Sequence, residues 1–521
     1  MGRKCQASFD LNLPVMCLAA ALAISSCRPA PEPALELGAQ PNVIVIMVDD
    51  LGYGDVGCYG ASAVQTPNID RLAAEGIRFT SGYAPAATCT PTRFAFLTGR
   101  YAWRQEGTGI APPNATAIIQ PGTVTLPTIM RQAGYTTGVV GKWHLGLGEK
   151  PAPNWNGELN PGPLEIGFDT CFLMPTTGDR VPCVYVENHR VVGLDPTDPI
   201  TVTDHNPDGQ PTGKTHRDTL KMDWSHGHNA SIINGISRIG FMTGGHAARW
   251  RDEDMADVFT EKAVDFIERH AGEPFFLFFS THDIHVPRMP HERFQGQTAL
   301  GFRGDAIVET DWCVGQLLET LDRLELTENT LVIFCSDNGP VLDDGYKDGA
   351  IEKLGDHTQA GPFRGGKYSI YEGGTRTPFI TRWPGTIAPG ISDEVVCVID
   401  IAASMASLAG QTLTGDACPD SFDLLPALLG EPGARGRDHL VEQGRGLALR
   451  MGDWKFLHHP DDKPVKSLTY EKGPGQFELF NLAQDPAETT NLIDAFPDRA
   501  ERMKKRLEEI RRSGRTRPEY R

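Results

Sequence analysis

An unbroken apolar run that ends in two aspartates constrains the fold most. Residues 42–48 are almost all apolar, most of them β-branched, and Asp49 and Asp50 follow directly. Such a run is typical of a strand buried on both faces, as strands are in a parallel sheet covered by helices. We therefore expect a central strand here, with both carboxylates at its carboxyl end.

Strands and helices are predicted to alternate along the chain. Helical periodicity and capping residues predict helices at 67–75, 126–132, 255–270 and 305–324, and apolar runs predict strands at 137–140, 275–279 and 330–335. This order predicts an α/β fold with a large, mostly parallel mixed sheet sandwiched by helices. Open α/β sheets bind ligands at the carboxyl ends of their strands.

The beginning of the chain has the features of an export signal. A basic start at Arg3 and Lys4 precedes an apolar run, residues 13–24, that is too short to span a bilayer. The run ends in a segment that resembles a bacterial lipobox, so residues 1–27 are predicted to be a signal peptide whose Cys27 becomes lipidated. A plain signal peptide with an incidental cysteine is the alternative. The expected location is the periplasm or the cell surface.

The remainder of the chain is predicted to form a tether and two folded parts. Residues 28–41 are rich in proline and predict a tether. A large domain is expected at 42–410, and its Gly-rich and Pro-rich segment 154–246 predicts long surface loops. Short apolar segments and a charged helix at 497–512 predict a smaller α+β subdomain at 411–521, with antiparallel strands.

The charge of the chain excludes one class of partner. The formal net charge is −18, whereas general nucleic-acid binders need a basic face. An acidic surface also repels anionic polymers at long range. Attraction of an anionic substrate would therefore have to be local, from a metal ion and a few cations inside a pocket.

Cys89 is the cysteine with the most distinctive surroundings among the eleven in the chain. Pro91 suits the first turn of a helix, so Cys89 is predicted to lie at a helix N-terminus, where free amides favour negative charge. Arg93 follows four residues later and can face the same site. The other cysteines show no spacing typical of zinc sites. The alternative is a buried cysteine that only starts a helix.

A second pair of polar residues, Asp337 and Asn338, also follows a predicted strand. With Asp49 and Asp50 they form a set of hard oxygen ligands, which suit Ca²⁺ or Mg²⁺ and not zinc or copper. Gathered without a metal, the three carboxylates would repel one another. Taken alone, both segments are also common turn sequences, but their position after buried strands favours the metal interpretation.

Several cationic side chains complete the set of residues suited to chemistry on an anionic ester. Lys142 and His144 follow a predicted strand, His285 follows another, and Lys367 lies in a glycine-rich segment. Each alone is more often a surface residue. Together they can neutralise the oxygens of an anionic group and protonate a leaving alcohol.

These segments resemble the motifs of the type I, formylglycine-dependent sulfatases, an arylsulfatase-like family of the alkaline phosphatase superfamily. The resemblance extends from about residue 42 to residue 492. The matching segments are Cys89–Arg93 with Leu97–Arg100, Gly141–Gly146, Thr281–Pro287 and Arg364–Lys367.

The resemblance implies a fold, an activity and a set of roles. The fold is alkaline phosphatase-like, with 42–410 as the catalytic domain, and the activity is hydrolysis of sulfate esters with release of inorganic sulfate. A maturation enzyme would convert Cys89 to formylglycine. The implied catalytic residues are Cys89, Arg93, Lys142, His144, His285 and Lys367. The implied ligands of one cation, calcium or magnesium, are Asp49, Asp50, Cys89, Asp337 and Asn338.

Two polar loops are predicted to line the mouth of the pocket. They resemble loops of bacterial sulfatases that act on carbohydrates, with galactose or N-acetylgalactosamine 6-sulfate as candidate substrates; solvated surface loops are the alternative. The predicted substrate-binding residues are Asp179, Arg180, His282, Asp356 and His357. The expected partners are a sulfated carbohydrate or aryl sulfate and the maturation enzyme, with no nucleic acid and with membrane contact only through the lipid anchor.

Two other functions stay open at this point. One is a phosphate or phosphonate ester hydrolase of the same superfamily. A two-zinc phosphatase would need further Asp and His ligands, and the uncommitted His-rich stretch 224–228 lacks strand-end aspartates. The other is a catalytically silent protein that binds sulfated glycans, against which the complete set of motif residues argues.

Overall fold

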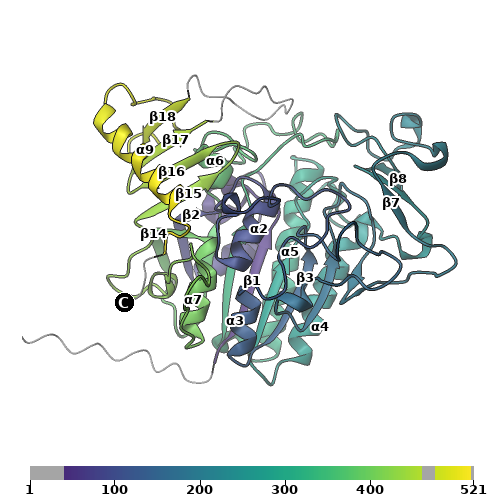
Figure 1. Ribbon diagram of the computed structural model, residues 1–521, viewed down its shortest axis with the longest axis horizontal. Coiled ribbons are helices and arrows are strands. Elements are labelled where there is room, and N and C mark those ends of the chain that lie inside the picture. Colours follow the sequence, from purple (N-terminus) through teal and green to yellow (C-terminus); the bar gives the residue numbers. More distant parts are fainter. Residues whose placement is uncertain (1–39, 460–475, 518–521) are drawn as a thin grey trace, which may run out of the picture. The chain divides into compact units, whose positions relative to one another are not determined.

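The computed structural model describes residues 40–459 and 476–517 (Figure 1). The predicted signal peptide and nearly all of the tether, with Cys27, lie outside the described residues. Gln40–Arg521 form one compact unit, and the proposed domain boundary near residue 410 stays a prediction.

A ten-stranded mixed sheet forms the core of this unit. Strand β1 pairs in parallel with β11 and with β12, and β11 pairs in parallel with β3. The four strands are β1 (Asn42–Val48), β11 (Phe275–Ser280), β12 (Thr330–Ser336) and β3 (Thr136–Lys142). Every residue of β1, β11 and β12 is buried, which confirms the interpretation of their apolar runs as strands covered on both faces.

The outer strands of the sheet include an antiparallel one, and they were not predicted from the sequence. The full order is β14-β2-β13-β12-β1-β11-β3-β4-β5-β6, in which β13 runs antiparallel to both β12 and β2. The outer strands are β2 (Ile77–Tyr83), β13 (Phe379–Arg382), β14 (Gly390–Cys397), β4 (Thr170–Met174), β5 (Val186–Glu187) and β6 (Arg190–Val191).

Strand β4 corrects the prediction that residues 154–246 form only surface loops. It pairs in parallel with β3, and four of its five residues are buried. Its apolar signal is too short to stand out among the surrounding glycines and prolines. The same segment contains two small antiparallel pairs, formed by β7 (Thr201–Thr203) with β10 (Phe241–Thr243) and by β8 (Ile232–Ile233) with β9 (Ile236–Ser237).

Two groups of helices cover the sheet. In one group α5 packs against α1 and α4, and in the other α7 packs against α2 and α3. The bounds are α1 (Pro67–Ala74), α2 (Cys89–Thr98), α3 (Leu126–Gln132), α4 (Met255–Arg269), α5 (Phe302–Arg323) and α7 (Ile401–Leu408), with short helices α6 (Glu372–Thr375) and α8 (Leu425–Leu428). The predicted α/β class is therefore confirmed. None of the helices in the described ranges has the length and apolar character needed to span a bilayer.

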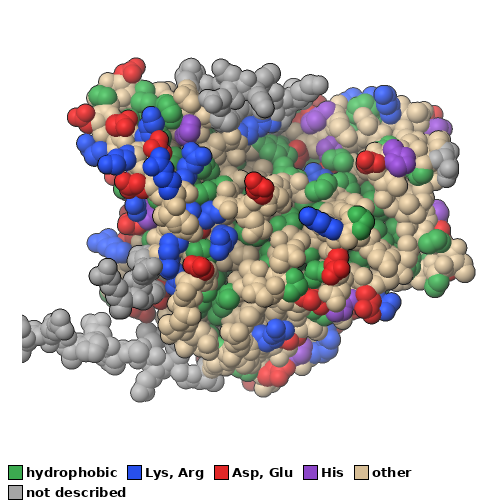
Figure 2. Space-filling model, in the orientation of Figure 1, with side chains coloured by type: hydrophobic (Ala, Val, Ile, Leu, Met, Phe, Trp, Pro, Cys, Tyr) green, Lys and Arg blue, Asp and Glu red, His purple; other side chains and the backbone are tan. Residues whose placement is uncertain are grey.

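The C-terminal part forms a second, antiparallel sheet in the order β15-β16-β17-β18. Its strands are β15 (His439–Gln443), β16 (Leu447–Met451), β17 (Trp454–His458) and β18 (Phe477–Asn481). Helix α9 (Pro497–Arg512) packs on the sheet through Met503, Leu507 and Ile510, and its outer face carries many Lys and Arg side chains (Figure 2). The same hydrophobic cluster includes Tyr83 and Ala95, so the small sheet shares a core with the large one.

A buried ionic cluster also holds the small sheet in place. Lys455 on β17 is fully buried, with its Nζ atom 2.8 Å from Glu372, 2.9 Å from Glu442 and 3.6 Å from Glu488. Burial opposes the charge on Lys455, but the three carboxylates outweigh that cost and raise its pKa. The cluster joins α6 to the second sheet.

Lys455→Met is expected to lower the free energy of unfolding by about 3 kcal/mol or more, because it leaves buried carboxylates without the ammonium that balances them. Denaturant unfolding measures the change. The matched control is Lys505→Met on the exposed side of α9, which should stay within about 0.5 kcal/mol of the parent. Equal stability of both variants would contradict the role of the cluster.

Candidate active site

The carboxyl ends of three parallel strands bring the predicted polar residues to one edge of the sheet. Asp49 and Asp50 follow β1, Asp337 and Asn338 follow β12, and Lys142 ends β3. All five side chains are fully buried. Because the strands are parallel neighbours, residues about 290 positions apart come into contact: Asn338 Nδ2 donates a 2.7 Å hydrogen bond to Asp50 Oδ1, with a sequence separation of 288.

Helix α2 points its N-terminus at this edge and begins with Cys89. One turn later, Arg93 is fully buried, and its Nε atom lies 2.9 Å from Asp337 Oδ2. The same guanidinium donates to the carbonyl of Lys142 at 3.0 Å and contacts the hydroxyl of Ser280. Arg93 therefore ties the helix that carries Cys89 to the ends of β12, β3 and β11.

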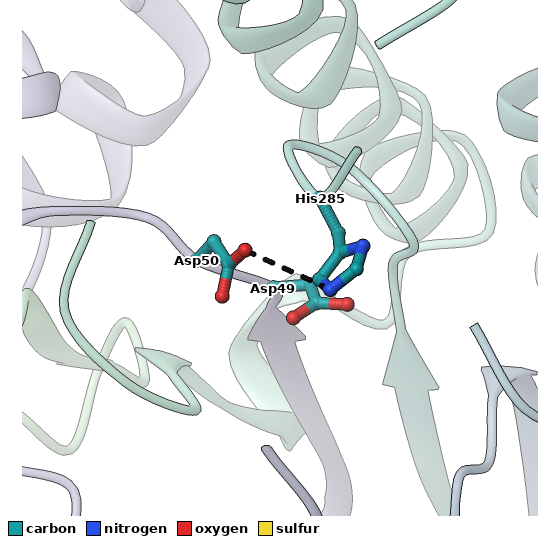
Figure 3. A group of neighbouring side chains, drawn as sticks. All are labelled: Asp49, Asp50 and His285. Atoms are coloured by element: carbon teal, nitrogen blue, oxygen red, sulfur yellow. Dashed lines mark ion pairs between the residues drawn. The ribbon is translucent and has the colours of Figure 1, made fainter. Parts of the chain in front are cut away.

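The carboxylates have the features of a cation site. Ligand atoms of Asp49, Asp50 and His285 lie within 4.8 Å of one another, and Figure 3 shows Asp50 facing His285 just beyond the end of β1. Within the described residues, neither Asp49 Oδ1 nor Asn338 Oδ1 has a hydrogen-bond partner, although both are buried. Burial, together with the charge of Asp337, raises the pKa of Asp49 well above its usual value. Crowded oxygen ligands with unpaired atoms fit a hard divalent cation.

Two lysines contact the carboxylates. Lys142 forms an ion pair with Asp49, and the Nζ atom of Lys367 lies 2.8 Å from Asp50 Oδ2. Lys367 also lies 2.8 Å from Asp344 Oδ2, and the other oxygen of Asp344 accepts a 2.9 Å hydrogen bond from the Tyr368 hydroxyl. Burial disfavours the charge on Lys367, but Asp344 and Asp50 outweigh this and raise its pKa. Each of the two lysines is therefore paired with at least one buried or partly buried carboxylate of the site.

His144 lies next to Cys89. Its Nδ1 atom is 3.2 Å from Cys89 Sγ, and its Nε2 atom is 2.9 Å from an Arg180 guanidinium nitrogen. Burial, with the charges of Lys142 and Arg180, holds the pKa of His144 well below its usual value. Burial also raises the pKa of the Cys89 thiol, despite the nearby lysines. The pair therefore consists of a neutral imidazole and a neutral thiol.

His285 lies near the carboxylates, on the segment that follows β11. Its Nδ1 atom donates a 2.7 Å hydrogen bond to the carbonyl of Val286, which leaves Nε2 as the nitrogen that faces the pocket. That Nε2 atom lies 3.9 Å from carboxylate oxygens of both Asp50 and Asp344. Burial and the charges of Lys367 and Lys142 keep the pKa of His285 well below its usual value.

These residues open into a small pocket. It is lined by Cys89, Ile110, Asp179, Arg180, His228, His285, Asp344, Lys367 and Tyr368. Asp179 and Arg180 line this pocket, and their role in substrate binding stays a prediction. His228 Nε2 lies 2.8 Å from Asp179 Oδ2, and although burial lowers the pKa of His228, this hydrogen bond outweighs it and raises the value.

Four residues that line the pocket were not predicted from the sequence: the apolar Ile110 and the polar His228, Asp344 and Tyr368. The stretch 224–228 is visibly rich in histidine, but it follows no strand and so had no predicted position. Asp344 lies in a loop six residues beyond Asn338. In a loop, the number of residues from a motif does not show where a side chain points.

The other three predicted substrate-binding residues are not among the described residues that line this pocket, and their role in binding stays a prediction. The His282 ring packs on Phe259, with its Nε2 atom 3.5 Å from Asp283. His357 Nε2 lies 2.9 Å from Asp55, which also pairs with Arg303 at 2.6 Å, and Asp356 is exposed. Proximity to a motif in sequence does not determine which way a loop side chain points.

Comparison with known proteins agrees with this geometry. The sulfatase family model matches residues 41–411. The chain is 50% identical to N-acetylgalactosamine-6-O-sulfatase of Bacteroides thetaiotaomicron, over 91% of this chain and 93% of the relative. It is 32% identical to human arylsulfatase A, over 88% of this chain and 84% of the relative.

Solved structures agree as well. A 6S-sulfatase structure from a Bacteroides thetaiotaomicron study of glycosaminoglycan metabolism is 50% identical, covers 91% of this chain and 100% of its own, and has a TM-score of 0.89. The phosphonate monoester hydrolase of Agrobacterium radiobacter, 16% identical with a TM-score of 0.56 over 91% of this chain and 96% of its own, shares the fold. The alkaline phosphatase-like fold and the resemblance stated from the motifs are both confirmed: the chain belongs to the sulfatase family of sulfuric ester hydrolases.

Proposed function

We propose that the protein removes sulfate from a carbohydrate, galactose or N-acetylgalactosamine 6-sulfate, by using formylglycine at position 89 and one divalent cation. The observation that carries the proposal is that Cys89 and Lys367 line one pocket, while Lys367 also forms an ion pair with the buried carboxylate of Asp50. The name of the relative that is 50% identical supports the sugar and the position of the sulfate.

The cation is proposed to be calcium, with magnesium as the alternative. Asp49, Asp50, Asp337 and Asn338 would hold it together with residue 89, and their oxygen atoms suit either ion. When bound, the cation supplies positive charge that attracts a sulfate oxygen and offsets the repulsion among the carboxylates. The unpaired buried oxygens of Asp49 and Asn338 support this assignment.

Cys89 is proposed as the precursor of the nucleophile and not as the nucleophile itself. Burial raises the pKa of its thiol, and a thiol with a raised pKa is a weak nucleophile. After conversion to formylglycine and hydration, residue 89 would supply two hydroxyl groups, one as a nucleophile toward sulfur and one that can give up a proton. The maturation enzyme that performs the conversion is therefore a required partner.

The other residues bind the sulfate or move protons. Lys142 and Lys367 neutralise sulfate oxygens, and Arg93 positions residue 89 through its bonds to Asp337 and Lys142. His285 with Lys367 donates a proton to the leaving sugar oxygen. Burial and the charges of the lysines lower the pKa of His285, and sulfate bound between His285 and the lysines would offset the part that the lysines contribute.

His144 is proposed as the base that accepts a proton from residue 89, because its Nδ1 atom lies 3.2 Å from Sγ and burial keeps it neutral. At the rim, the Asp179–His228 pair and Arg180 offer hydrogen bonds to sugar hydroxyls. We also propose that the protein is exported and anchored through Cys27, on the composition of residues 1–27.

Cys89→Ala is expected to abolish sulfate release, by about 1000-fold or more, because no hydroxyl nucleophile can form. Sulfate ion measurement gives the rate, and circular dichroism checks the fold. The control is Cys58→Ala, which changes a free cysteine outside the pocket. An active preparation whose residue 89 is entirely thiol by peptide mass would contradict the mechanism. Faster turnover of nitrophenyl phosphate than of nitrophenyl sulfate would favour the phosphatase alternative.

Calcium added to chelator-treated protein is expected to raise the melting temperature by about 5 °C at saturating concentration, since it binds only the folded state. Asp50→Asn should lose most of this shift because it removes a ligand charge. Asp356→Asn, an exposed carboxylate away from the pocket, should keep it. A full shift in Asp50→Asn would show that calcium stabilises the protein elsewhere.

Asp179→Ala is expected to lower the ratio of kcat/KM for the sugar sulfate to that for nitrophenyl sulfate by about 100-fold, because a sugar hydroxyl loses a buried hydrogen-bond partner. His228→Ala should have a similar effect, and the double variant should add little, since the two side chains act as a pair. Initial-rate kinetics measure the ratio. An unchanged ratio in both variants would remove the pair from substrate recognition.

A further inference from the structure

A second, larger hollow adjoins the pocket that holds Cys89. Two segments form its walls, residues 105–121 and residues 148–161. We call it the outer groove. Its volume of about 1130 Å³ compares with about 50 Å³ for the pocket, so the pocket has room for the sulfate group and its immediate surroundings, while the groove reaches the size of sites for whole ligands.

Ile110 connects the two hollows, because it lines both. It is 41% exposed, whereas Cys89 and Lys367 at the base of the pocket are only 2% exposed. Ile110 therefore forms the lip of the pocket on the side of the outer groove. A molecule whose sulfate lies against Cys89, and which extends past Ile110, enters the groove.

The loop next to Ile110 is attached to the site itself. The carbonyl of Ala111 lies 3.1 Å from His144 Nε2, and the Ala111 amide donates a 3.2 Å hydrogen bond to the Thr90 hydroxyl. One side of this loop thus contacts the proposed base and the residue after Cys89, while the other side lines the groove.

The walls of the outer groove are also fixed relative to each other. Main-chain hydrogen bonds join Ala117 to Gly148 at 3.0 Å and Leu147 to Ala115 at 3.1 Å. Gly146 has φ of 70°, and a Cβ atom there would lie 2.1 Å from the carbonyl oxygen of Thr116. The glycine that ends the Lys142–Gly146 motif is therefore required by the contact between the active segment and the groove wall. A preformed groove orders little of its own chain when it binds a ligand, which lowers the entropic cost of binding.

The groove has the chemistry of a saccharide site, with little positive charge. Amide side chains of Gln105, Gln120 and Asn160 can bond sugar hydroxyls, and Ile110 and several prolines offer apolar surface. Among the described residues that line it, the charged ones are Glu106, Glu149 and Lys150, all exposed. The local excess of negative charge adds to the net charge of −18 on the whole chain.

We propose that the outer groove binds the saccharide attached to the sulfated sugar, and that it accepts an uncharged saccharide in preference to one that carries a carboxylate or a further sulfate. The inference rests on the proposed function, because the sulfate group must lie in the Cys89 pocket for the saccharide that carries it to extend past Ile110. Glu106 and Glu149 disfavour an anionic neighbour, and the amides and apolar walls suit neutral sugar rings.

Three substrates with the same terminal 6-sulfated sugar test this: the free monosaccharide, its conjugate to an N-acetylhexosamine, and its conjugate to a glucuronate. The neutral conjugate is expected to exceed the monosaccharide in kcat/KM by about 10-fold, and the glucuronate conjugate to fall below the neutral one. Asn160→Ala should reduce the advantage of the neutral conjugate. Equal kcat/KM for the monosaccharide and the neutral conjugate would overturn the groove as a binding site.

The double variant Glu106→Gln/Glu149→Gln tests the charge preference. It should raise the ratio of kcat/KM for the glucuronate conjugate to that for the neutral one by about 5-fold, and high salt should have a similar effect. The control Glu261→Gln/Glu501→Gln changes two exposed acids on α4 and α9 and should leave the ratio unchanged. A ratio that does not respond to Glu106 and Glu149 would overturn the preference.

Failure of the proposed function is separable from failure of this inference. If no sugar sulfate is turned over, calorimetry with the Cys89→Ala variant still measures the dissociation constants of all three compounds. Tighter binding of the neutral conjugate than of the other two supports the groove even then. Equal binding of all three overturns it.

Discussion

The concentration of like charge at one buried edge of the sheet is the constraint on which the rest of the site depends. Asp49, Asp50 and Asp337 are fully buried, and burying three carboxylates together is costly unless cations balance them. Arg93 and Lys142 meet that need from helix α2 and strand β3. These ion pairs attach helix α2 and strand β3 to the ends of the strands that carry the carboxylates.

This balance decides what kind of chemistry the pocket supports. Cys89 and His144 are buried, so neighbouring charges act strongly on both. The imidazole of His144 is held neutral and the Cys89 thiol is held protonated. A site of this kind suits an anionic substrate that fits among cations. It suits an ordinary thiol nucleophile poorly, in agreement with membership of the sulfatase family.

The C-terminal sheet and the outer groove both contact elements that carry residues of the active site. The small C-terminal sheet shares a hydrophobic cluster with Tyr83 and with Ala95, which lies on the helix that begins at Cys89. The outer groove is joined to the site by the loop that contains Ala111 and by the close approach at Gly146. The C-terminal sheet is therefore packed against the helix that carries Cys89, and the outer groove is attached to the segment that follows strand β3.

The sequence by itself determined the α/β class, the central strands and the motif residues at their ends, because buried strands and strand-end polar residues leave a local, periodic signal. Asp49 and Asp337 could be assigned to one edge since parallel strands must end on the same side. Only the tertiary structure decided that β4 joins the sheet. It also placed Asp344 and the hydrogen-bonded pair of His228 and Asp179 at the pocket. It likewise decided the placement of His357 against Asp55. Loop side chains take their direction from partners that are distant in sequence, and no local pattern records those partners.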